Sequence, residues 1–330
     1  MPNSPFPDIP KIQISTAGVA SRLKKLKPNK ACGPDELPPT IYRDYADELA
    51  PMLAFIFQQT YDKGTIPDDW KEALVSAIHK KGSTSSPSNY RPISLTCIAC
   101  KVMEHIVLSN INKHLEHLNI INEKQHGFRS GLSCTTQLIE SINDWASELD
   151  KKQGTKVCQV DTILLDFSKA FDRVPHAKLL EKLKFYGIRG PMLNWTESFL
   201  IGRTQKVSVN GIHSSPINVT SGVPQGSVLG PTLFLLYIND INNNVNSTVR
   251  LFADDSLLYR PIWSQKDHEM LQKDLELLTS WANKWQMSFN VTKCKVLSIT
   301  KKGPLSFHIH HGRRTPRTRS FSPLPRRHPC

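Results

Sequence analysis

Two short apolar runs flank a pair of adjacent carboxylates in the second half of the chain. The runs 249–252 and 257–259 are rich in Val, Leu, Phe and Tyr and short enough to be strands, which predicts a β-hairpin with residues 253–256 at its tip. Asp254 and Asp255 repel each other on such a turn, and burial strengthens the repulsion. A divalent cation such as Mg²⁺ would relieve it, because hard cations prefer carboxylate oxygen. A solvated acidic turn is the alternative.

A third carboxylate on another strand would decide between these alternatives. Residues 156–165 are largely apolar and predict a strand whose C-terminal end delivers Asp166. An isolated buried charge is costly, so either a cation or a salt bridge must satisfy Asp166. Asp172 lies past the strand end, and we interpret it as a cap or a structural ion pair.

The chain is strongly basic, with a net charge of +13 and a pI of about 9.4. This charge favours a polyanionic partner, although a generically basic protein would show it too. No run approaches about eighteen apolar residues, so we expect no transmembrane helix and no membrane partner. The seven cysteines are scattered, which predicts reduced thiols in an intracellular setting, the nucleus or the cytoplasm. Nothing in the sequence indicates the oligomeric state.

Three further stretches carry residues suited to binding phosphate or nucleic acid. Lys80 follows a predicted strand at 73–78, and Arg91 follows the next polar loop, so the two cations could clamp a triphosphate or be plain surface charges. The glycine-punctuated loop 221–231 could bring backbone close to a ligand or be a tight packing turn. The loop 123–131 fits both a segment that follows a nucleic-acid backbone and a simple connector.

The remaining pattern is that of a mixed α/β chain. Residues 1–20 are rich in proline and predict a loose leader, and residues 303–330 predict a disordered basic tail. Asn-Gly at 210–211 predicts a hairpin within 203–213. Helical periodicity and strand-like runs predict helices at 40–62, 96–118, 134–151, 176–186, 191–201, 232–241 and 264–287, and a further strand at 296–299.

Carboxylates from separate strands are what two-metal phosphoryl transfer needs. Such sites hold two Mg²⁺ ions about 3.5–4 Å apart, with Mn²⁺ as an alternative ion. One ion lowers the pKa of an attacking hydroxyl, and the other stabilises the leaving pyrophosphate. Lys80 and Arg91 would offset charge on the triphosphate.

The motifs, in their order along the chain, resemble the reverse transcriptase domain of non-LTR (LINE-type) retrotransposons of the jockey-like kind. The resemblance covers roughly residues 20–302 and includes six motifs in the order of that family. They are Arg-Pro-Ile-Ser-Leu at 91–95, Gly-Phe-Arg-Ser-Gly at 127–131, Leu-Asp-Phe-Ser-Lys-Ala-Phe-Asp at 165–172, Ser-Gly-Val-Pro-Gln-Gly-Ser-Val-Leu-Gly-Pro at 221–231, Phe-Ala-Asp-Asp at 252–255 and Asn-Val-Thr-Lys at 290–293.

This resemblance implies an α/β (α+β) right-hand polymerase, with fingers at 21–155 and a palm at 156–302 whose antiparallel sheet is flanked by helices. It implies an RNA-directed DNA polymerase, a nucleotidyltransferase that uses an RNA template, a DNA primer and deoxynucleoside triphosphates. The implied catalytic and metal-binding residues are Asp166, Asp254 and Asp255, with the carbonyl of Phe167 also near metal.

The resemblance also implies roles for residues around the nucleotide. Lys80 and Arg91 contact the triphosphate, and Gln225 lines the nucleotide and template pocket. Phe171 occupies the position of a steric gate against a ribose 2′-hydroxyl, with a core aromatic residue as the alternative. Lys293 matches a lysine proposed to protonate pyrophosphate, with a surface lysine as the alternative.

Other features depart from the family pattern. Members usually carry an endonuclease before this region and a primer grip and thumb after it, whereas we expect the thumb to be missing here and the chain to be a truncated copy. The alternative functions are a non-catalytic nucleic-acid-binding remnant and an RNA-templated RNA polymerase.

Overall fold

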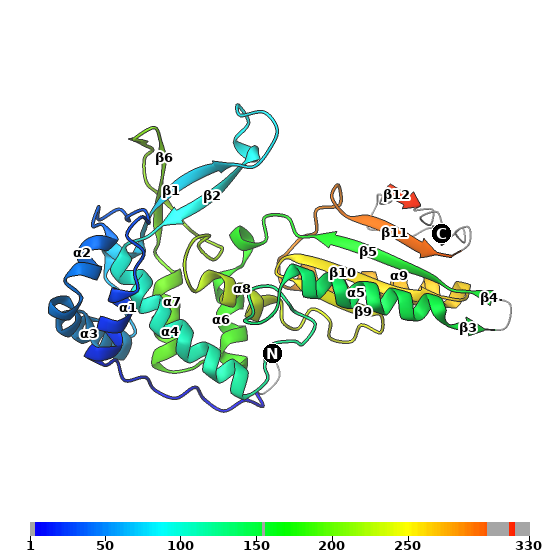
Figure 1. Cartoon of the computed structure of the whole chain (residues 1–330), viewed down its shortest axis with the longest axis horizontal. Coiled ribbons are helices and arrows are strands. Elements are labelled where there is room, and N and C mark those ends of the chain that lie inside the picture. Colours follow the sequence, from blue (N-terminus) through cyan, green and yellow to red (C-terminus); the bar gives the residue numbers. More distant parts are fainter. Residues whose placement is uncertain (1–3, 154–155, 302–316, 321–330) are drawn as a thin grey trace, which may run out of the picture. The chain divides into compact units, whose positions relative to one another are not determined.

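The computed structural model describes residues 4–153, 156–301 and 317–320, in which helices alternate with short strands (Figure 1). Tertiary contacts divide the chain into two units, each made of two separate stretches. The first unit comprises Met1–Ile121 and Phe171–Tyr237, and the second comprises Asn122–Ala170 and Ile238–Cys330. This mixed architecture confirms the predicted α/β class. The boundary between fingers and palm at 155/156 stays a prediction.

The first unit packs helices beside a five-stranded sheet of order β2-β1-β6-β7, with β8 also paired to β6. All pairs are antiparallel except β1 with β6. Its helices are α1 Thr16–Lys24, α2 Pro39–Asp44, α3 Ala46–Lys63, α4 Ile98–His117, α6 His176–Phe185, α7 Pro191–Leu200 and α8 Gly230–Ile238, with 3-10 turns at Asp68–Lys71, Pro87–Asn89 and Phe171–Arg173. Its strands are β1 Glu72–His79, β2 Tyr90–Leu95, β6 Thr204–Val209, β7 Ile212–His213 and β8 Ile217–Asn218.

The N-terminal segment differs from the predicted loose leader. Ile9 and Ile12 are buried, and their backbone N–H groups donate to the Gly187 carbonyl at 2.8 Å and to the Tyr61 hydroxyl at 3.4 Å. Helix α1 begins at Thr16, where the hydroxyl of Ser15 caps it. Two isoleucines among prolines give no periodic signal, so their burial against a distant part of the chain could not be read from the pattern.

The helix predicted at 40–62 is two helices, because Tyr45 leaves helical geometry between α2 and α3. Gly64 ends α3. Its φ of 64° lies in the left-handed region that glycine adopts without strain.

The second unit contains a five-stranded sheet of order β12-β11-β5-β10-β9. Pairs β9–β10, β10–β5 and β5–β11 are antiparallel, as predicted for a palm, and β12 joins β11 in parallel. Its strands are β5 Gln159–Asp166, β9 Thr248–Phe252, β10 Asp255–Ile262, β11 Lys295–Thr300 and β12 Arg317–Ser320, and a short pair joins β3 Lys152–Gln153 to β4 Lys156–Val157. Its helices are α5 Cys134–Asp150 and α9 Gln265–Lys284.

Helices α5 and α9 cover opposite faces of this sheet. Side chains alternate between faces along a strand, and residues directly opposite in neighbouring strands share a face. Tyr259 of β10 bonds to Asp144 of α5. Asp161 of β5 lies opposite Arg260, the residue that follows Tyr259 in β10. The carboxylate of Asp161 interacts electrostatically with His268 of α9. The core therefore lies mainly between the sheet and α9, where Ile163, Leu258, Val296, Leu271, Leu275 and Leu278 are buried.

The predicted disordered tail, 303–330, lies outside the described residues except for β12. These four residues form a strand, which differs from the prediction. No helix in the described ranges is both long and apolar enough to cross a membrane.

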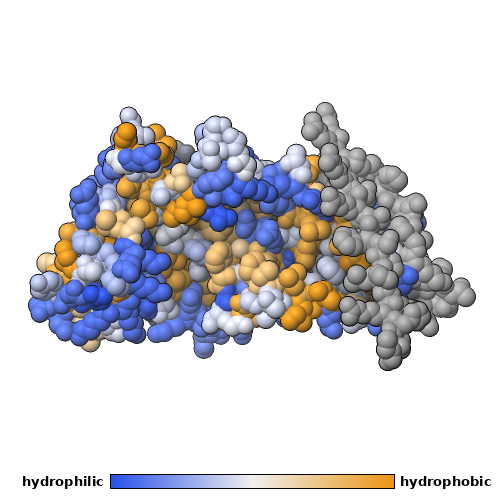
Figure 2. Space-filling model, turned by 45° about the horizontal axis from the view of Figure 1, so that its top comes forward, coloured by the Kyte–Doolittle hydropathy of each residue, from blue (hydrophilic) through white to orange (hydrophobic). Residues whose placement is uncertain are grey.

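The surface is not uniformly polar. Figure 2 shows hydrophobic residues interspersed among hydrophilic ones. Exposed large apolar side chains include Phe55 of α3, Ile139 of α5 and Ile212 of β7. Single exposed apolar residues are ordinary in folded chains, so they do not by themselves mark a binding surface.

Candidate active site

The predicted acidic hairpin is present, with a tighter turn than expected. Asp255 pairs with Phe252, so Ala253 and Asp254 alone form the turn between β9 and β10, which we call the acidic turn. The predicted tip at 253–256 was wrong by two residues, because Asp255 and Ser256 belong to β10 and Ser256 is buried. Ala253 has a φ of 53°, in the left-handed region that permits so tight a connection.

Asp166 lies directly opposite Asp255 in the antiparallel pairing of β5 with β10. Cα atoms of such partners are about 4.5–5.5 Å apart, so the two side chains leave the same face of the sheet side by side. Burial raises the pKa of Asp255, and the negative charges of Asp254 and Asp166 raise it further, against a lowering by Lys293. The three predicted carboxylates therefore meet at one end of the sheet.

Residues 288–293 hold the end of β5 in place. The N–H of Asn290 donates to the Asp166 carbonyl at 2.7 Å, and the N–H of Ser168 donates to the Ser288 carbonyl at 2.8 Å. Between them, the buried ring of Phe167 stacks on Phe289 with centroids 4.5 Å apart. The predicted metal-proximal residue Phe167 thus anchors the backbone immediately after Asp166.

Lys293 reaches the carboxylates from this same segment. Its Nζ lies 3.0 Å from Oδ2 of Asp166. The side chain remains largely exposed, so the contact is compatible with a surface lysine as well, and the role of Lys293 stays a prediction.

The donor set fits a divalent cation bound with few protein ligands. Over the residues that the structure describes, no three His, Cys, Asp or Glu side chains are placed so that they could together hold a metal ion. Mg²⁺ seldom uses such a set of side chains, since it keeps waters and is held by one or two carboxylates together with substrate phosphates. Burial is the largest cause of the raised pKa of Asp255, and the repulsion from Asp254 and Asp166 that adds to it is what a cation would remove.

The loop at 123–131, for which the sequence left open a nucleic-acid contact or a simple connector, pairs with the hairpin. The N–H of Leu251 donates to the Lys124 carbonyl at 2.9 Å, and the N–H of His126 donates to the Leu251 carbonyl at 2.9 Å. Gly127 packs so close that an added Cβ would lie 2.2 Å from the backbone nitrogen of Ala253. The glycine in the Gly-Phe-Arg motif was the signal for this close approach.

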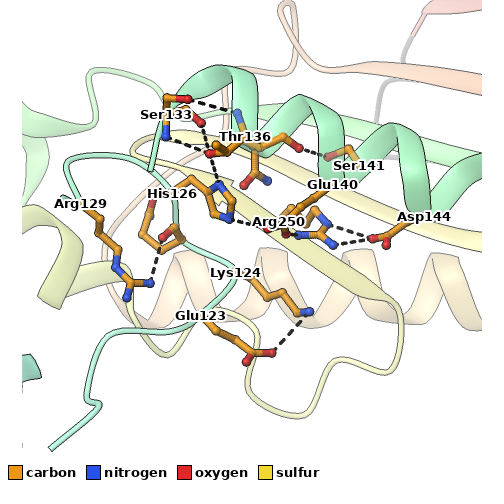
Figure 3. Close-up of polar contacts among 12 residues, drawn as sticks. Glu123, Lys124, His126, Arg129, Ser133, Thr136, Glu140, Ser141, Asp144 and Arg250 are labelled. Carbon is orange, nitrogen blue, oxygen red and sulfur yellow. Dashed lines mark hydrogen bonds and ion pairs between the residues drawn. The ribbon is translucent and has the colours of Figure 1, made fainter. Parts of the chain in front are cut away.

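An ionic network around the buried Arg250 joins this loop, α5 and the hairpin (Figure 3). The guanidinium of Arg250 donates to Asp144 through Nη2 at 2.7 Å and through Nε at 3.0 Å, and it also contacts Glu140. The ring nitrogens of His126 face Thr136 Oγ1 at 2.9 Å and Glu140 Oε1 at 3.5 Å. Burial opposes the charge of Arg250, but hydrogen bonding to Asp144 and its other partners holds its pKa above the ordinary value.

In the first unit, Lys80 and Arg91 share one face of the β1–β2 hairpin. Ile78 pairs with Arg91, and the N–H of Lys80 continues the pairing by donating to the Asn89 carbonyl at 2.8 Å. Residues two apart in a strand point the same way, so Lys80 lies on the face of Ile78 and Arg91. Both cations are exposed.

Gln225 sits in a loop that is fixed at several points. Its Nε2 donates to Asp172 Oδ1 at 3.0 Å, and its carbonyl accepts from the Ser94 N–H at 2.6 Å. Asp172, interpreted from the sequence as a cap or an ion-pair partner, thus accepts a hydrogen bond from Gln225. Gly226, with a φ of 106°, fits against the Ser94 carbonyl, where an added Cβ would lie 2.7 Å away.

Glu104 of α4 was not identified from the sequence. It is fully buried, and its Oε2 accepts from the N–H groups of Val228 at 2.7 Å and Leu229 at 3.0 Å, just before α8. Burial raises its pKa, while those two hydrogen bonds lower it. A glutamate among the buried positions of a helix was the available signal.

Phe171 is half-buried and stacks on Phe234 of α8, with centroids 4.5 Å apart and an interplanar angle of 20°. Its carbonyl accepts from the N–H of Val223 at 2.8 Å, which ties it to the Gln225 loop. The ring is thus partly a packing residue and partly exposed.

An antiparallel sheet that gathers three carboxylates at the end of its central strands defines a polymerase-type α/β protein. Residues 78–320 match the family model of reverse transcriptase (RNA-dependent DNA polymerase), so the chain belongs to that family. The resemblance predicted from the six motifs is confirmed. The family implies dependence on divalent metal ions and action on a nucleic-acid template and primer with nucleotides.

Two similar proteins support the assignment of the chain to this family. The chain is 33% identical over 311 residues to the RNA-directed DNA polymerase from mobile element jockey of Drosophila melanogaster. The aligned region covers 91% of this chain and 33% of that protein. It is 30% identical over 302 residues to the probable RNA-directed DNA polymerase from transposon X-element of the same fly, covering 89% and 33%. The chain thus spans about a third of the length of these relatives.

Proposed function

We propose that the chain catalyses RNA-directed DNA synthesis. A primer 3′-hydroxyl attacks the α-phosphate of a deoxynucleoside triphosphate, the new phosphodiester bond forms, and pyrophosphate leaves. The observation that carries the proposal is the pairing of Asp166 with Asp255 across β5 and β10, with Asp254 in the adjoining turn.

In this proposal Asp166, Asp254 and Asp255 would hold two Mg²⁺ ions. When bound, these ions would activate the attacking hydroxyl and stabilise the charge that develops on the leaving group. The protein's own contribution is to fix the carboxylates on rigid strands. Asp166 is held by its carbonyl bond to Asn290 and Asp255 by its place in the ladder, so little reorganisation is needed when substrate arrives.

The first unit would bind the nucleotide. Lys80 acts as a point charge and Arg91 as a bidentate fork for the triphosphate, since both are exposed on one face of the hairpin. Gln225 lines the pocket for nucleotide and template, with its amide oriented by Asp172. Phe171 excludes a ribose 2′-hydroxyl by its bulk.

Lys293 would donate a proton to the pyrophosphate leaving group. Its ammonium is held 3.0 Å from Asp166, which keeps it beside the reacting phosphates if the carboxylate binds metal as proposed.

A primer-extension assay tests the proposal. The wild-type chain, given an RNA template, an annealed DNA primer, deoxynucleoside triphosphates and Mg²⁺, should extend the primer. Asp254→Asn preserves shape but removes a charge, and should reduce the rate by about a thousandfold. The matched control is Asp150→Asn, which changes an exposed carboxylate at the end of α5 and should leave extension unchanged.

Two results would count against the proposal. If neither the wild type nor Asp254→Asn extends the primer while both bind it, the non-catalytic nucleic-acid-binding alternative is favoured. If ribonucleotides are used as readily as deoxynucleotides, the RNA-templated RNA polymerase alternative is favoured.

A further inference from the structure

Gln125 is a buried polar residue that the proposed mechanism does not use, and we infer that it is the positioning residue of the acidic turn. This inference rests on the proposed function of that turn. The Gln125 Oε1 accepts from the N–H of Ala253 at 2.9 Å and from the N–H of Gly127 at 2.7 Å. One oxygen therefore joins the loop 123–131 to the turn that carries Asp254.

The acidic turn needs such support because of its backbone. Ala253 has a φ of 53°, a conformation that residues with a Cβ rarely adopt. Ala253 is also buried, so its N–H has no ready access to water and depends on a protein acceptor. Gln125 supplies that acceptor when Ala253 has the left-handed conformation that forms the two-residue turn.

The position of Gln125 is itself fixed by backbone pairing. Leu251 bonds to Lys124 and to His126, the residues on either side of Gln125, so the loop lies along β9 in a defined register. Gly127 allows the loop to touch the turn, since any Cβ there would clash with Ala253. Gln125 is only 2% exposed, which limits the alternative conformations of its side chain.

The consequence for chemistry follows from the order of residues. Asp254 comes directly after Ala253, so rotation of the Ala253 backbone moves the Asp254 carboxylate relative to Asp166 and Asp255. Catalytic groups tolerate only small displacements before the rate falls. Loss of the Gln125 acceptor should therefore affect turnover and metal use more than nucleotide binding.

The test is Gln125→Met in the full chain, which keeps side-chain length and removes the acceptor. The matched control is Gln137→Met in α5, a buried glutamine of the same unit whose side-chain oxygen and nitrogen have no hydrogen-bond partner among the described residues. Hydrogen exchange of the Ala253 amide is the first readout, because it needs no activity. We expect exchange to rise at least tenfold in Gln125→Met and to stay unchanged in Gln137→Met.

Primer extension is the second readout. We expect kcat to fall at least tenfold in Gln125→Met, with KM for the nucleotide within twofold of wild type and the Mg²⁺ concentration for half-maximal rate raised severalfold. Gln137→Met should leave kcat unchanged. A purely structural role of Gln125 would lower the melting temperature of Gln125→Met and leave kcat of its folded fraction unchanged, and that result would overturn the inference.

A second variant covers the case in which Gln125→Met fails to fold. Gln125→Glu keeps an oxygen that can accept both hydrogen bonds, so the Ala253 amide should remain as protected as in the wild type. Rapid exchange at Ala253 in folded Gln125→Glu would overturn the inference. An inactive wild-type chain would overturn only the proposed function, since exchange at Ala253 would still decide whether Gln125 holds the turn.

Discussion

The ammonium of Lys293 lies 3.0 Å from the carboxylate of Asp166, and both side chains reach solvent. An ion pair with a largely exposed lysine contributes only about 0–1 kcal/mol to stability. Its main effect is to offset negative charge where Asp166, Asp254 and Asp255 meet. The pair therefore matters for the occupancy of the site more than for folding.

We predict that Lys293→Met changes the free energy of unfolding by less than about 1 kcal/mol. Removal of the cation frees Asp166, so Mn²⁺ should bind more tightly in the absence of nucleotide, as measured by electron paramagnetic resonance. Primer extension should slow if Lys293 protonates pyrophosphate. Lys151→Met, at another exposed pair with 2.6 Å separation, is the control and should change neither property. Weaker Mn²⁺ binding in Lys293→Met would contradict this account.

Phe171 provides a test of sugar selection. Phe171→Ala removes a half-buried ring that stacks on Phe234, so stability should fall by about 1–3 kcal/mol. If the exposed part of the ring excludes the 2′-hydroxyl, the ratio of kcat/KM for deoxynucleotides to that for ribonucleotides should fall at least tenfold. Phe234→Leu disturbs the same stack from within α8 and should cost stability with little change in that ratio. Equal sugar discrimination in Phe171→Ala and wild type would show that Phe171 is only a packing residue.

The elements carrying the acidic triad could be predicted because their signals are local. An apolar run before Asp166 and alternating apolar residues around Asp254 define strands whatever the rest of the chain does. The exact turn could not be predicted, because it depends on Ala253 in a left-handed conformation held by Gln125, 128 residues away. A turn conformation that depends on a contact so far along the chain leaves no signal in the local pattern.

The same limit applies to Glu104 and Arg250. In the sequence each is one more charged residue in an amphipathic segment. Glu104 accepts a hydrogen bond from the N–H of Val228, which lies 124 residues further along the chain. Arg250 donates to Asp144, which lies 106 residues before it. No periodic pattern encodes such pairings, so the partners of these groups emerge only once the fold is known.

Arg250 is predicted to be a major contributor to the stability of the second unit. Arg250→Met leaves Glu140, Asp144 and the Tyr259 hydroxyl without their common donor. Breaking a buried pair costs about 3–5 kcal/mol, and the partial exposure of both carboxylates should reduce this to about 2–4 kcal/mol. Urea unfolding measures the loss. Arg260→Met, on the next strand with a longer 3.8 Å contact to Asp267, is the control and should cost less than about 1 kcal/mol.

Partial rescue distinguishes charge from packing in this network. Asp144→Asn in the Arg250→Met background removes one of the stranded charges, so it should restore part of the lost stability. A double variant as unstable as the sum of the two single variants would show that the network acts mainly through packing.

Glu104 makes the stability of the first unit depend on pH. Burial raises its pKa in the folded state above the ordinary 4.5, so the folded chain binds this proton more tightly than the unfolded chain. The stabilisation from this group is then complete below the unfolded pKa and is lost as pH rises through the folded pKa. Glu104→Gln keeps an oxygen to accept from Val228 and Leu229 but cannot titrate.

Wild type and Glu104→Gln should differ in how steeply the free energy of unfolding changes with pH. Above pH 4.5, the free energy of unfolding of wild type should fall relative to that of Glu104→Gln, by at most about 1.4 kcal/mol per pH unit because one proton is involved. The absolute stability of Glu104→Gln can be lower at every pH, since Arg203 is buried nearby and its charge loses a partner. Cys100, the other group that interacts with Glu104, has its pKa raised well above 9.0 and does not titrate in this range. Parallel pH profiles from urea unfolding of the two proteins would show that the two N–H groups outweigh burial and that Glu104 stays ionised in the fold.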